Sequence, residues 1–461
     1  MSRPVPVVAG DALRRHLPRQ RWYAGTSEPA SVEIVHAEML RDEWPMLARL
    51  LVEADGDCYQ VLLGLRPEHD PLEFLRGHDE AAFGPVEVQV DGDGSGGEWA
   101  TAYDAVLDPD LGLHIFWRVT GGDESAMRVR PIGVEQSNTS LVYDERLILK
   151  VFRRLRAGSN PEVEVTSGLT RVGFAWVAEA LATESMVTEK GDGYDLALLQ
   201  PFLAGGVDGW ALALTSLRDL FGLHDTQSMP AIVPGAPPPA ADPAEAGGDF
   251  SGDAFRLGGT TAAMHIALAK AFGRERGDAG VWADDIEDQA RRSVGDVVSA
   301  LAVLDELRHV DPGPAIRTHG DYHLGQVMRT DAGWFVLDFE GEPDRPLEER
   351  QRLTSPLRDV AGMLRSLHYA SAVALTERDG EEFEQPAAAW EARNRRAFLD
   401  GYLPAAARGG ILPSNRAAVG AVLAAFELEK AVYELSYERA HRPEWEHIPR
   451  TALRRLAAGF R

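Results

Sequence analysis

The sequence predicts an α+β protein whose N-terminal part is rich in strands and whose C-terminal part is mainly helical. Short apolar runs such as Val32–Val35 and Tyr59–Gly64 mark strands in the first 200 residues, and helical periodicity continues from Leu203 almost to the end. At roughly 150 residues per unit, 461 residues correspond to about three units. We expect a cap at 1–98 that ends in the turn-rich DGDGSGGE, a β-rich lobe with one helix at 99–203 and a helical lobe at 204–461.

Within these regions the apolar patterns predict individual elements in order along the chain. A Pro-, Ala- and Gly-rich insertion is expected to interrupt the helical lobe at 225–252, and two strands form a short β island within it. The strands expected are Leu113–Val119, Ser140–Tyr143, Leu147–Phe152, Leu196–Leu203, 315–318 and 334–339, and a helix is expected at Pro161–Leu169.

The charge and cysteine content exclude several classes of protein. Asp and Glu outnumber Lys and Arg by 72 to 47, and the formal net charge of −25 disfavours nucleic acid as a partner. The single cysteine, Cys58, cannot form an internal disulfide or a thiolate metal cage. Since neither a secretory leader nor a long apolar span is evident, we expect a cytoplasmic protein without a membrane partner.

Lysine is scarce in this sequence. Of the 47 basic residues four are lysine, namely Lys150, Lys190, Lys270 and Lys430. Because arginine serves elsewhere as the general positive charge, a lysine is weak evidence that a compact ammonium is required at its position. Ordinary surface placement is the alternative for each of them.

The segment RTHGDYHLGQVMRTDAGWFVLDFEGEP at 317–343 carries the strongest chemical signal. It places Asp321 after a short strand, Gln326 five residues later and Asp338 at the end of the next apolar run. A base for an attacking hydroxyl and two oxygen ligands for Mg²⁺ are the groups that phosphoryl transfer needs, and kinase catalytic loops use this spacing. The alternative, two ordinary β-turns with capping aspartates, is weakened by the three residues standing in register.

An upstream hairpin at 141–155 offers the lysine that such chemistry also needs. Its second strand ends in Lys150, where a kinase holds the lysine that pairs with the nucleotide phosphates. Glu164, on the helix that follows, is our first choice for the carboxylate that fixes Lys150, and Glu162 is not excluded. Solvated carboxylates at a helix N-terminus are the alternative for both.

Two further segments are candidates for nucleotide contacts. The loop before the hairpin contains Ser137, Asn138 and Thr139 and no glycine-rich pattern, so hydroxyls and backbone N–H groups would meet the phosphates. Backbone groups from Gln200 to Phe202, where an apolar strand enters a glycine turn, are candidates to bind an adenine edge. An ordinary buried strand and turn explain the second segment equally well.

Several segments together resemble the actinobacterial maltokinases, which are relatives of aminoglycoside phosphotransferases and protein kinases. They are HGDYHLGQ, VLDFEGEP, SPLRDVAGMLRSLHYA at 355–370, LPRQRWYAG at 17–25 and EKAVYELSYERAHRPEW at 429–445. The resemblance implies a bilobal protein kinase-like fold with an N-terminal β-rich cap, ATP and Mg²⁺, and phosphate transfer to the anomeric hydroxyl of maltose. By position it assigns Asp321 as the base, Gln326 and Asp338 as metal ligands and Lys150 as the phosphate lysine.

The helix at 426–441 is the candidate reader of a sugar acceptor. Lys430, Tyr433, Glu434, Tyr437 and His441 recur at three- and four-residue spacing, and aromatic faces beside charged groups suit sugars. A tyrosine stripe packed into the core is the alternative. The acidic residues Glu340 and Glu342 are further candidates for hydroxyls or a second metal, with an acidic surface turn as the alternative. His319, Arg358 and Asp359 are expected to brace the loop, and Trp22 and Tyr23 to be core aromatics of the cap.

Two rival functions stay open at this point. Actinobacterial glucosamine kinases share the cap and the loop, so glucosamine or an aminoglycoside is a possible acceptor, which the acidic turn Glu340, Glu342 and Asp344 would suit. A catalytically silent pseudokinase scaffold is the alternative outside enzymes, and the intact motif argues against it. The resemblance also implies a trehalose-converting enzyme as a partner, although no residues here indicate a contact surface.

Overall fold

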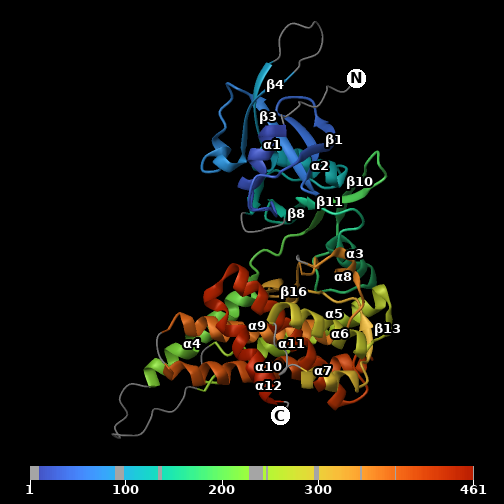
Figure 1. The fold of residues 1–461 in the computed structure, drawn as a ribbon. Helices are drawn as coiled ribbons and strands as arrows, with labels where there is room; N and C mark the ends of the chain where they lie inside the picture. Colours follow the sequence, from blue (N-terminus) through green and yellow to red (C-terminus); the bar gives the residue numbers. More distant parts are fainter. Residues whose placement is uncertain are drawn as a thin grey trace. The chain divides into compact units, whose positions relative to one another are not determined.

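The computed structural model describes residues 10–88, 98–132, 138–227, 242–245, 248–294, 301–342, 345–378 and 381–459. The chain divides into unit 1, residues 1–164 and 178–204, and unit 2, residues 165–177 and 205–461. Figure 1 shows strands as the main elements of unit 1 and helices as those of unit 2. Most of the insertion expected at 225–252 lies outside the described residues.

Unit 1 contains a first antiparallel sheet in the strand order β1-β2-β3-β5-β4, with the short β9 paired to β3. Helix α1 (Gly10–His16) precedes it, and its core contains Trp22, with Tyr23 packed against that core, as expected. Strand β5 begins at Glu98, so this sheet includes residues that the sequence assigned to the second lobe. The strands are β1 (Val32–Arg41), β2 (Met46–Ala54), β3 (Asp57–Pro67), β4 (Ala82–Val88), β5 (Glu98–Asp104) and β9 (Arg154–Leu155).

The second sheet of unit 1 has the order β10-β11-β8-β7-β6, also antiparallel. It contains the strands expected at Ser140–Tyr143, Leu147–Phe152 and, in part, Leu196–Leu203. Helix α3 (Pro161–Val172) starts where the sequence predicts and passes from unit 1 to unit 2 at residue 165. The strands are β6 (Val129–Ile132), β7 (Asn138–Tyr143), β8 (Leu147–Phe152), β10 (Ala182–Val187) and β11 (Gly193–Pro201).

The strand expected at Leu113–Val119 is wrong, because these residues belong to helix α2 (Pro109–Thr120). The carboxylate of Asp108 caps this helix by accepting from the backbone N–H of Asp110 at 3.0 Å, and Gly121 ends it in the left-handed conformation at φ 62°. The apolar residues bury one helical face rather than alternating, and the Asp-Pro start was the local signal that we missed.

Unit 2 is a helical body around one large core, with two small sheets at its edge. The β island is confirmed as β14 (Pro314–Ile316) and β16 (Trp334–Val336), which pair with β13 (Arg274–Arg276) and β15 (Val327–Arg329); β12 (Val207–Asp208) completes the second sheet. The helices are α4 (Gly209–Gln227), α5 (Ser251–Phe272), α6 (Ala279–Val294), α7 (Leu301–Arg308), α8 (Leu347–Gln351), α9 (Leu357–Thr376), α10 (Glu384–Arg408), α11 (Arg416–His441) and α12 (His447–Gly459).

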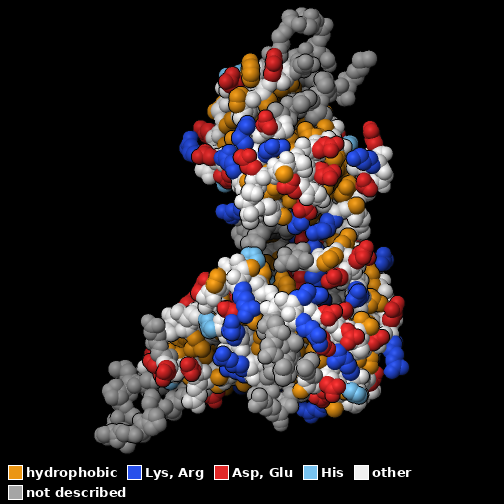
Figure 2. All heavy atoms as spheres, viewed as in Figure 1, with side chains coloured by type: hydrophobic (Ala, Val, Ile, Leu, Met, Phe, Trp, Pro, Cys, Tyr) orange, Lys and Arg blue, Asp and Glu red, His pale blue; other side chains and the backbone are white. Residues whose placement is uncertain are grey.

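Basic and acidic side chains are interspersed over the face of the molecule in Figure 2, so the net negative charge does not gather there in one place. Across the described ranges, every helix is too short or too polar to pass through a lipid bilayer.

Candidate active site

Asp321 lies on the loop between β14 and the 3₁₀ turn Leu324–Gln326, and one buried carboxylate holds the loop's backbone. Asp359, near the start of α9, accepts the backbone N–H of His319 at 2.7 Å and of Gly320 at 3.0 Å. Gly320 has φ 89°, a conformation that a side chain would strain. The loop therefore depends on Asp359, for which we expected this supporting role.

The imidazole of His319 fixes the same loop from the other side. Its Nε2 donates to the carbonyl of Leu337 at 2.8 Å, and its Nδ1 accepts the backbone N–H of Asp321 at 3.4 Å. One ring nitrogen thus bonds within the loop and the other joins the loop to Leu337 after β16, and the bracing role expected for His319 is confirmed.

Asp359 is itself held by His265 and Tyr402, two residues that we did not predict as part of the site. The fully buried His265 of α5 donates from Nε2 to Asp359 at 3.0 Å and meets the hydroxyl of Tyr402 at 2.9 Å. Burial raises the pKa of Asp359, but the hydrogen bond and charge of His265 outweigh it and lower that pKa below its usual value. His265 and Tyr402 carry no local sequence signal for this role, because the residues that they bond are far away along the chain. His265, for example, is 94 residues from Asp359.

Gln326 and Asp338 lie side by side on neighbouring strand ends. The backbone N–H of Leu337 donates to the Gln326 carbonyl, and the Gln326 Nε2 donates to Asp338 Oδ2, both at 2.9 Å. Asp338 has φ 60°, a strained value for a residue other than glycine. A carboxylate beside an amide forms the oxygen donor set that Mg²⁺ prefers, so these two residues fit the metal predicted for them.

Lys430 of α11 binds the candidate base directly. Its Nζ donates to Asp321 Oδ1 at 2.9 Å and to Glu342 Oε1 at 2.8 Å, and it lies 4.9 Å from the centre of the Tyr433 ring. Burial by itself lowers the pKa of Lys430, but the two carboxylates raise it above its usual value, so the side chain stays an ammonium. We expected Lys430 to contact the sugar acceptor and did not predict its bond to Asp321.

The ion pair continues into a buried network of alternating charges. Glu342, 2% exposed, also binds Arg345 and, at 3.3 Å, Arg358. Both arginines reach Glu429 of α11, Arg345 at 2.9 Å and Arg358 at 3.0 Å. Burial raises the pKa of Glu342, and the surrounding cations, Lys430 first, outweigh it and lower that pKa far below its usual value. Glu342 is therefore ionised and buried, which rules out the alternative of an acidic surface turn, and its candidate role toward hydroxyls or a second metal stays a prediction.

His323 also faces the base. Its Nδ1 accepts the backbone N–H of Gly325 at 3.0 Å, and its Nε2 lies 3.8 Å from Asp321 Oδ2, beyond hydrogen-bond distance. Burial lowers the pKa of His323, against the opposing charge of Asp321, so the ring is neutral near pH 7.

The aromatic residues of α11 form a stacked row that starts beside Lys430. The ring centres of Tyr433 and Tyr437 are 6.3 Å apart, and those of Tyr437 and His441 are 4.3 Å apart. Glu434, which we grouped with them, instead accepts two bonds from Arg365 of α9 at 3.0 and 2.7 Å. These two bonds turn Glu434 toward α9, and its contact with the acceptor stays a prediction.

Glu340 of unit 2 is half-buried, and its backbone carbonyl accepts Arg350 Nη1 at 3.2 Å.

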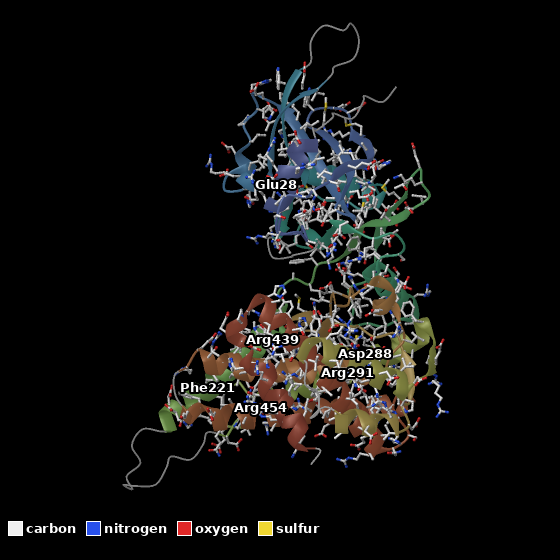
Figure 3. The ribbon with its side chains drawn as sticks, viewed as in Figure 1. Glu28, Phe221, Asp288, Arg291, Arg439 and Arg454 are labelled. Atoms are coloured by element: carbon white, nitrogen blue, oxygen red, sulfur yellow. The ribbon has the colours of Figure 1, made fainter. Side chains whose placement is uncertain are left out.

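A polar cavity of about 290 Å³ lies next to the charged network, which contributes Arg345, Arg358 and Glu429 to its lining. Residues of α6 form another wall, among them Asp288, which is labelled in Figure 3. Its described lining residues do not include Asp321.

In unit 1, strand register places Lys150. Lys150 pairs with Ser140 on β7 and with Leu198 on β11, so it lies on the central strand of the second sheet. Its Nζ donates to Glu162 Oε2 at 2.6 Å, and both side chains are nearly buried. An ion pair of the kind predicted for Lys150 is thus present.

The partner of Lys150 is Glu162 rather than Glu164, our first choice. The side chain of Asn160 caps α3 by accepting the backbone N–H of Glu162 at 2.8 Å, which places Glu162 in the first turn. Residues two apart on a helix point about 200° apart, so one helix start cannot direct both carboxylates to the same lysine.

The structure gives less support to the nucleotide contacts that we predicted in unit 1. Ser137 lies outside the described residues, whereas Asn138 and Thr139 belong to β7 and not to a loop. The Thr139 hydroxyl accepts Arg153 Nε at 2.9 Å, so it is turned toward the fully buried Arg153. The strand position of Thr139 therefore corrects its assignment to a phosphate loop.

Residues Gln200 to Phe202, whose backbone groups we expected to bind an adenine edge, already make hydrogen bonds within unit 1. The Phe202 N–H donates to the carbonyl of Arg146 at 2.8 Å, and the Gln200 side chain donates to the carbonyl of Ala178 at 2.8 Å. An adenine would have to replace the first of these bonds, so this prediction gains no support from the geometry.

Comparisons relate this chain to glucosamine kinases and to the maltokinase cap domain. The model of the maltokinase N-terminal cap domain matches residues 16–108. A glucosamine kinase of Streptacidiphilus jiangxiensis is 28% identical over 342 residues, 70% of this chain and 72% of that protein, and one of Mycolicibacterium smegmatis is 26% identical over 359 residues, 73% and 82%. A solved glucosamine kinase in complex with glucosamine, ADP and inorganic phosphate has the same fold, with a TM-score of 0.64 at 22% identity over 98% of this chain and 99% of that one.

The chain thus has the fold of the solved glucosamine kinase over almost its whole length. More particularly, residues 16–108 match the maltokinase N-terminal cap domain, and the sequence is similar to those of two glucosamine kinases.

Proposed function

We propose that the protein is an ATP-dependent sugar kinase that transfers the γ-phosphate to the anomeric hydroxyl of maltose. The observation that carries this proposal is the loop in which His319 and Asp359 hold Asp321 while Gln326 and Asp338 meet beside it. A position defined this tightly suits a residue that must orient a hydroxyl for attack on phosphorus. The maltokinase cap supports maltose as the acceptor.

Each unit contributes its own residues to the reaction. Asp321 accepts the proton of the sugar hydroxyl as its oxygen bonds to the γ-phosphorus and the bond to the β-phosphate oxygen breaks, which leaves ADP. Lys150, fixed by Glu162, neutralises nucleotide phosphates. Mg²⁺ bound by Gln326 and Asp338 would offset the negative charge of the phosphates.

The acceptor side of the proposal rests on α11. The stacked row of Tyr433, Tyr437 and His441 leads away from Lys430 and offers aromatic faces to the C–H surfaces of sugar rings. A helix rises 1.5 Å per residue, so eight residues from 433 to 441 span about 12 Å, longer than one sugar ring. This length favours a disaccharide over a monosaccharide.

Glucosamine is the second candidate acceptor. The two curated relatives are named glucosamine kinases, and the fold is that of a solved one. Cytoplasmic location and a trehalose-converting partner stay predictions.

The experiment measures ATP consumption by the purified protein with Mg²⁺ and maltose, glucose, glucosamine, trehalose or an aminoglycoside. We expect turnover with maltose, and a loss of about 10³-fold in Asp321→Asn, because a positioned general base contributes 10²–10⁴-fold. ATP binding by the variant should change little.

The outcomes separate the parts of the proposal. Selective turnover of glucosamine would keep the mechanism and overturn the acceptor, and no turnover with any sugar would overturn the function. An equal loss of turnover and ATP binding in Asp321→Asn would show that Asp321 is structural.

A further inference from the structure

The ammonium of Lys430 occupies a position that bears on the charge of the acceptor. It binds one oxygen of Asp321 at 2.9 Å and is buried against Glu342, 2.8 Å away, and the Tyr433 ring. A hydroxyl oriented by the other oxygen of Asp321 would lie within about two hydrogen-bond lengths of this cation. The acceptor's nearest protein charge is therefore a pair, a carboxylate already matched by an ammonium.

At the centre of the wider network carboxylates and cations are equal in number, and Glu349, 47% exposed and 3.7 Å from Arg345, adds one negative charge at its edge. Asp321, Glu342 and Glu429 alternate with Lys430, Arg345 and Arg358, and each of the three carboxylates accepts a bond from at least one of the three cations. The six formal charges sum to zero. An amino sugar brings a further positive charge, and its binding is favoured where a carboxylate lacks a cation, which this network does not provide.

We propose that Lys430 is a specificity-determining residue that selects neutral sugars against amino sugars at the Asp321 site. The proposal rests on the function proposed above and narrows its acceptor class. An ammonium on the carbon next to the reacting hydroxyl would approach Lys430 through a partly buried medium, where like charges repel more strongly than in water. A hydroxyl at the same position can accept a hydrogen bond from Lys430 instead.

The test compares maltose with glucosamine in the full-length protein and in Lys430→Gln, Lys430→Arg and Lys270→Gln. The readout is the ratio of kcat/KM for the two sugars, accompanied by the ratio of their binding constants from calorimetry. A uniform loss of activity through a misplaced Asp321 cancels in the ratio. Lys270 is a matched control, since it is an exposed lysine of the same unit that bonds the carbonyl of Val172 at 3.2 Å.

We expect Lys430→Gln to shift both ratios at least tenfold toward glucosamine, while Lys430→Arg and Lys270→Gln stay within threefold of the wild type. An unchanged ratio in Lys430→Gln, or the same shift in Lys430→Arg, would overturn the proposal. If the wild type turns over neither sugar, the proposed kinase function fails, and the binding ratios still decide the role of Lys430.

Discussion

Lys150 in unit 1 and Asp321 in unit 2 are both expected to act on phosphate chemistry, but the chain holds them by different means. Backbone register fixes Lys150 between β7 and β11, and an ion pair to Glu162 holds its side chain. Asp321 lies on a loop whose shape depends on side chains of α5, α9 and α11. A strand position tolerates most neighbouring substitutions because many hydrogen bonds share it, whereas a loop held by a few buried polar groups depends on each of them.

The largest effect is expected from a change to Asp359, the residue on which the loop depends. Asp359→Asn replaces a carboxylate that accepts His319 N–H, Gly320 N–H and His265 Nε2 with an amide that offers one acceptor and one donor. We expect unfolding free energy to fall by about 3 kcal/mol, as for other broken buried charge networks, and kcat by roughly 10²-fold through a misplaced Asp321. Urea unfolding and steady-state kinetics measure both.

Asp284→Asn serves as the control for this variant, because that carboxylate is 72% exposed in the same unit and pairs with Arg308. A change of about 0.5 kcal/mol or less is expected there. If Asp359→Asn matched this control, the loop would not depend on the buried network.

A pair of variants in unit 1 makes the second comparison. Glu162→Gln keeps the shape of the side chain but removes the charge that fixes Lys150, and we expect kcat/KM for ATP to fall roughly tenfold, the effect of losing about 1.4 kcal/mol. Glu164→Gln is the matched control two residues away and should change little. Equal losses in both variants would indicate a general effect at the start of α3 rather than the ion pair.

The last prediction concerns the acid stability of unit 1 and leaves kcat unchanged. His16 is 2% exposed and stacks on Phe83 with ring centres 3.6 Å apart, and burial lowers its pKa from 6.5 to about 4. The folded state therefore binds a proton less readily than the unfolded chain. Stability is fully present above pH 6.5 and is lost as the pH falls from there toward 4. This loss amounts to about 2 kcal/mol between pH 7 and pH 5.

His16→Phe should remove that dependence while leaving kcat unchanged, because His16 lies in the cap and a phenyl ring suits an apolar site. Urea unfolding followed by tryptophan fluorescence at pH 5 and pH 7 measures the difference. His69→Asn at an exposed position of the same unit is the control, and a pH dependence that persists in His16→Phe would contradict the assignment to His16.

Local signals predicted much of the fold and the chemical residues of the loop. The spacing of Asp321, Gln326 and Asp338 and the strand end at Lys150 depend on residues near one another in the chain, and the structure brings Gln326 and Asp338 together and pairs Lys150 with a glutamate of the next helix. The helix at 109–120 was missed because its apolar content also suits a strand, and the capping Asp108 and terminal Gly121 went unused.

By itself the sequence determined the strand-rich and helical parts, the loop motif and the scarcity of lysine, because propensity, turn chemistry and composition are local properties. The tertiary structure alone decided that Lys430 pairs with Asp321, 109 residues away, that Glu434 turns to Arg365 and that Glu162 rather than Glu164 meets Lys150. Charged side chains pair with the opposite charges that lie near them in the folded structure, and breaking such a pair strongly destabilises the protein when it is buried. The spacing of residues along the chain does not give these distances.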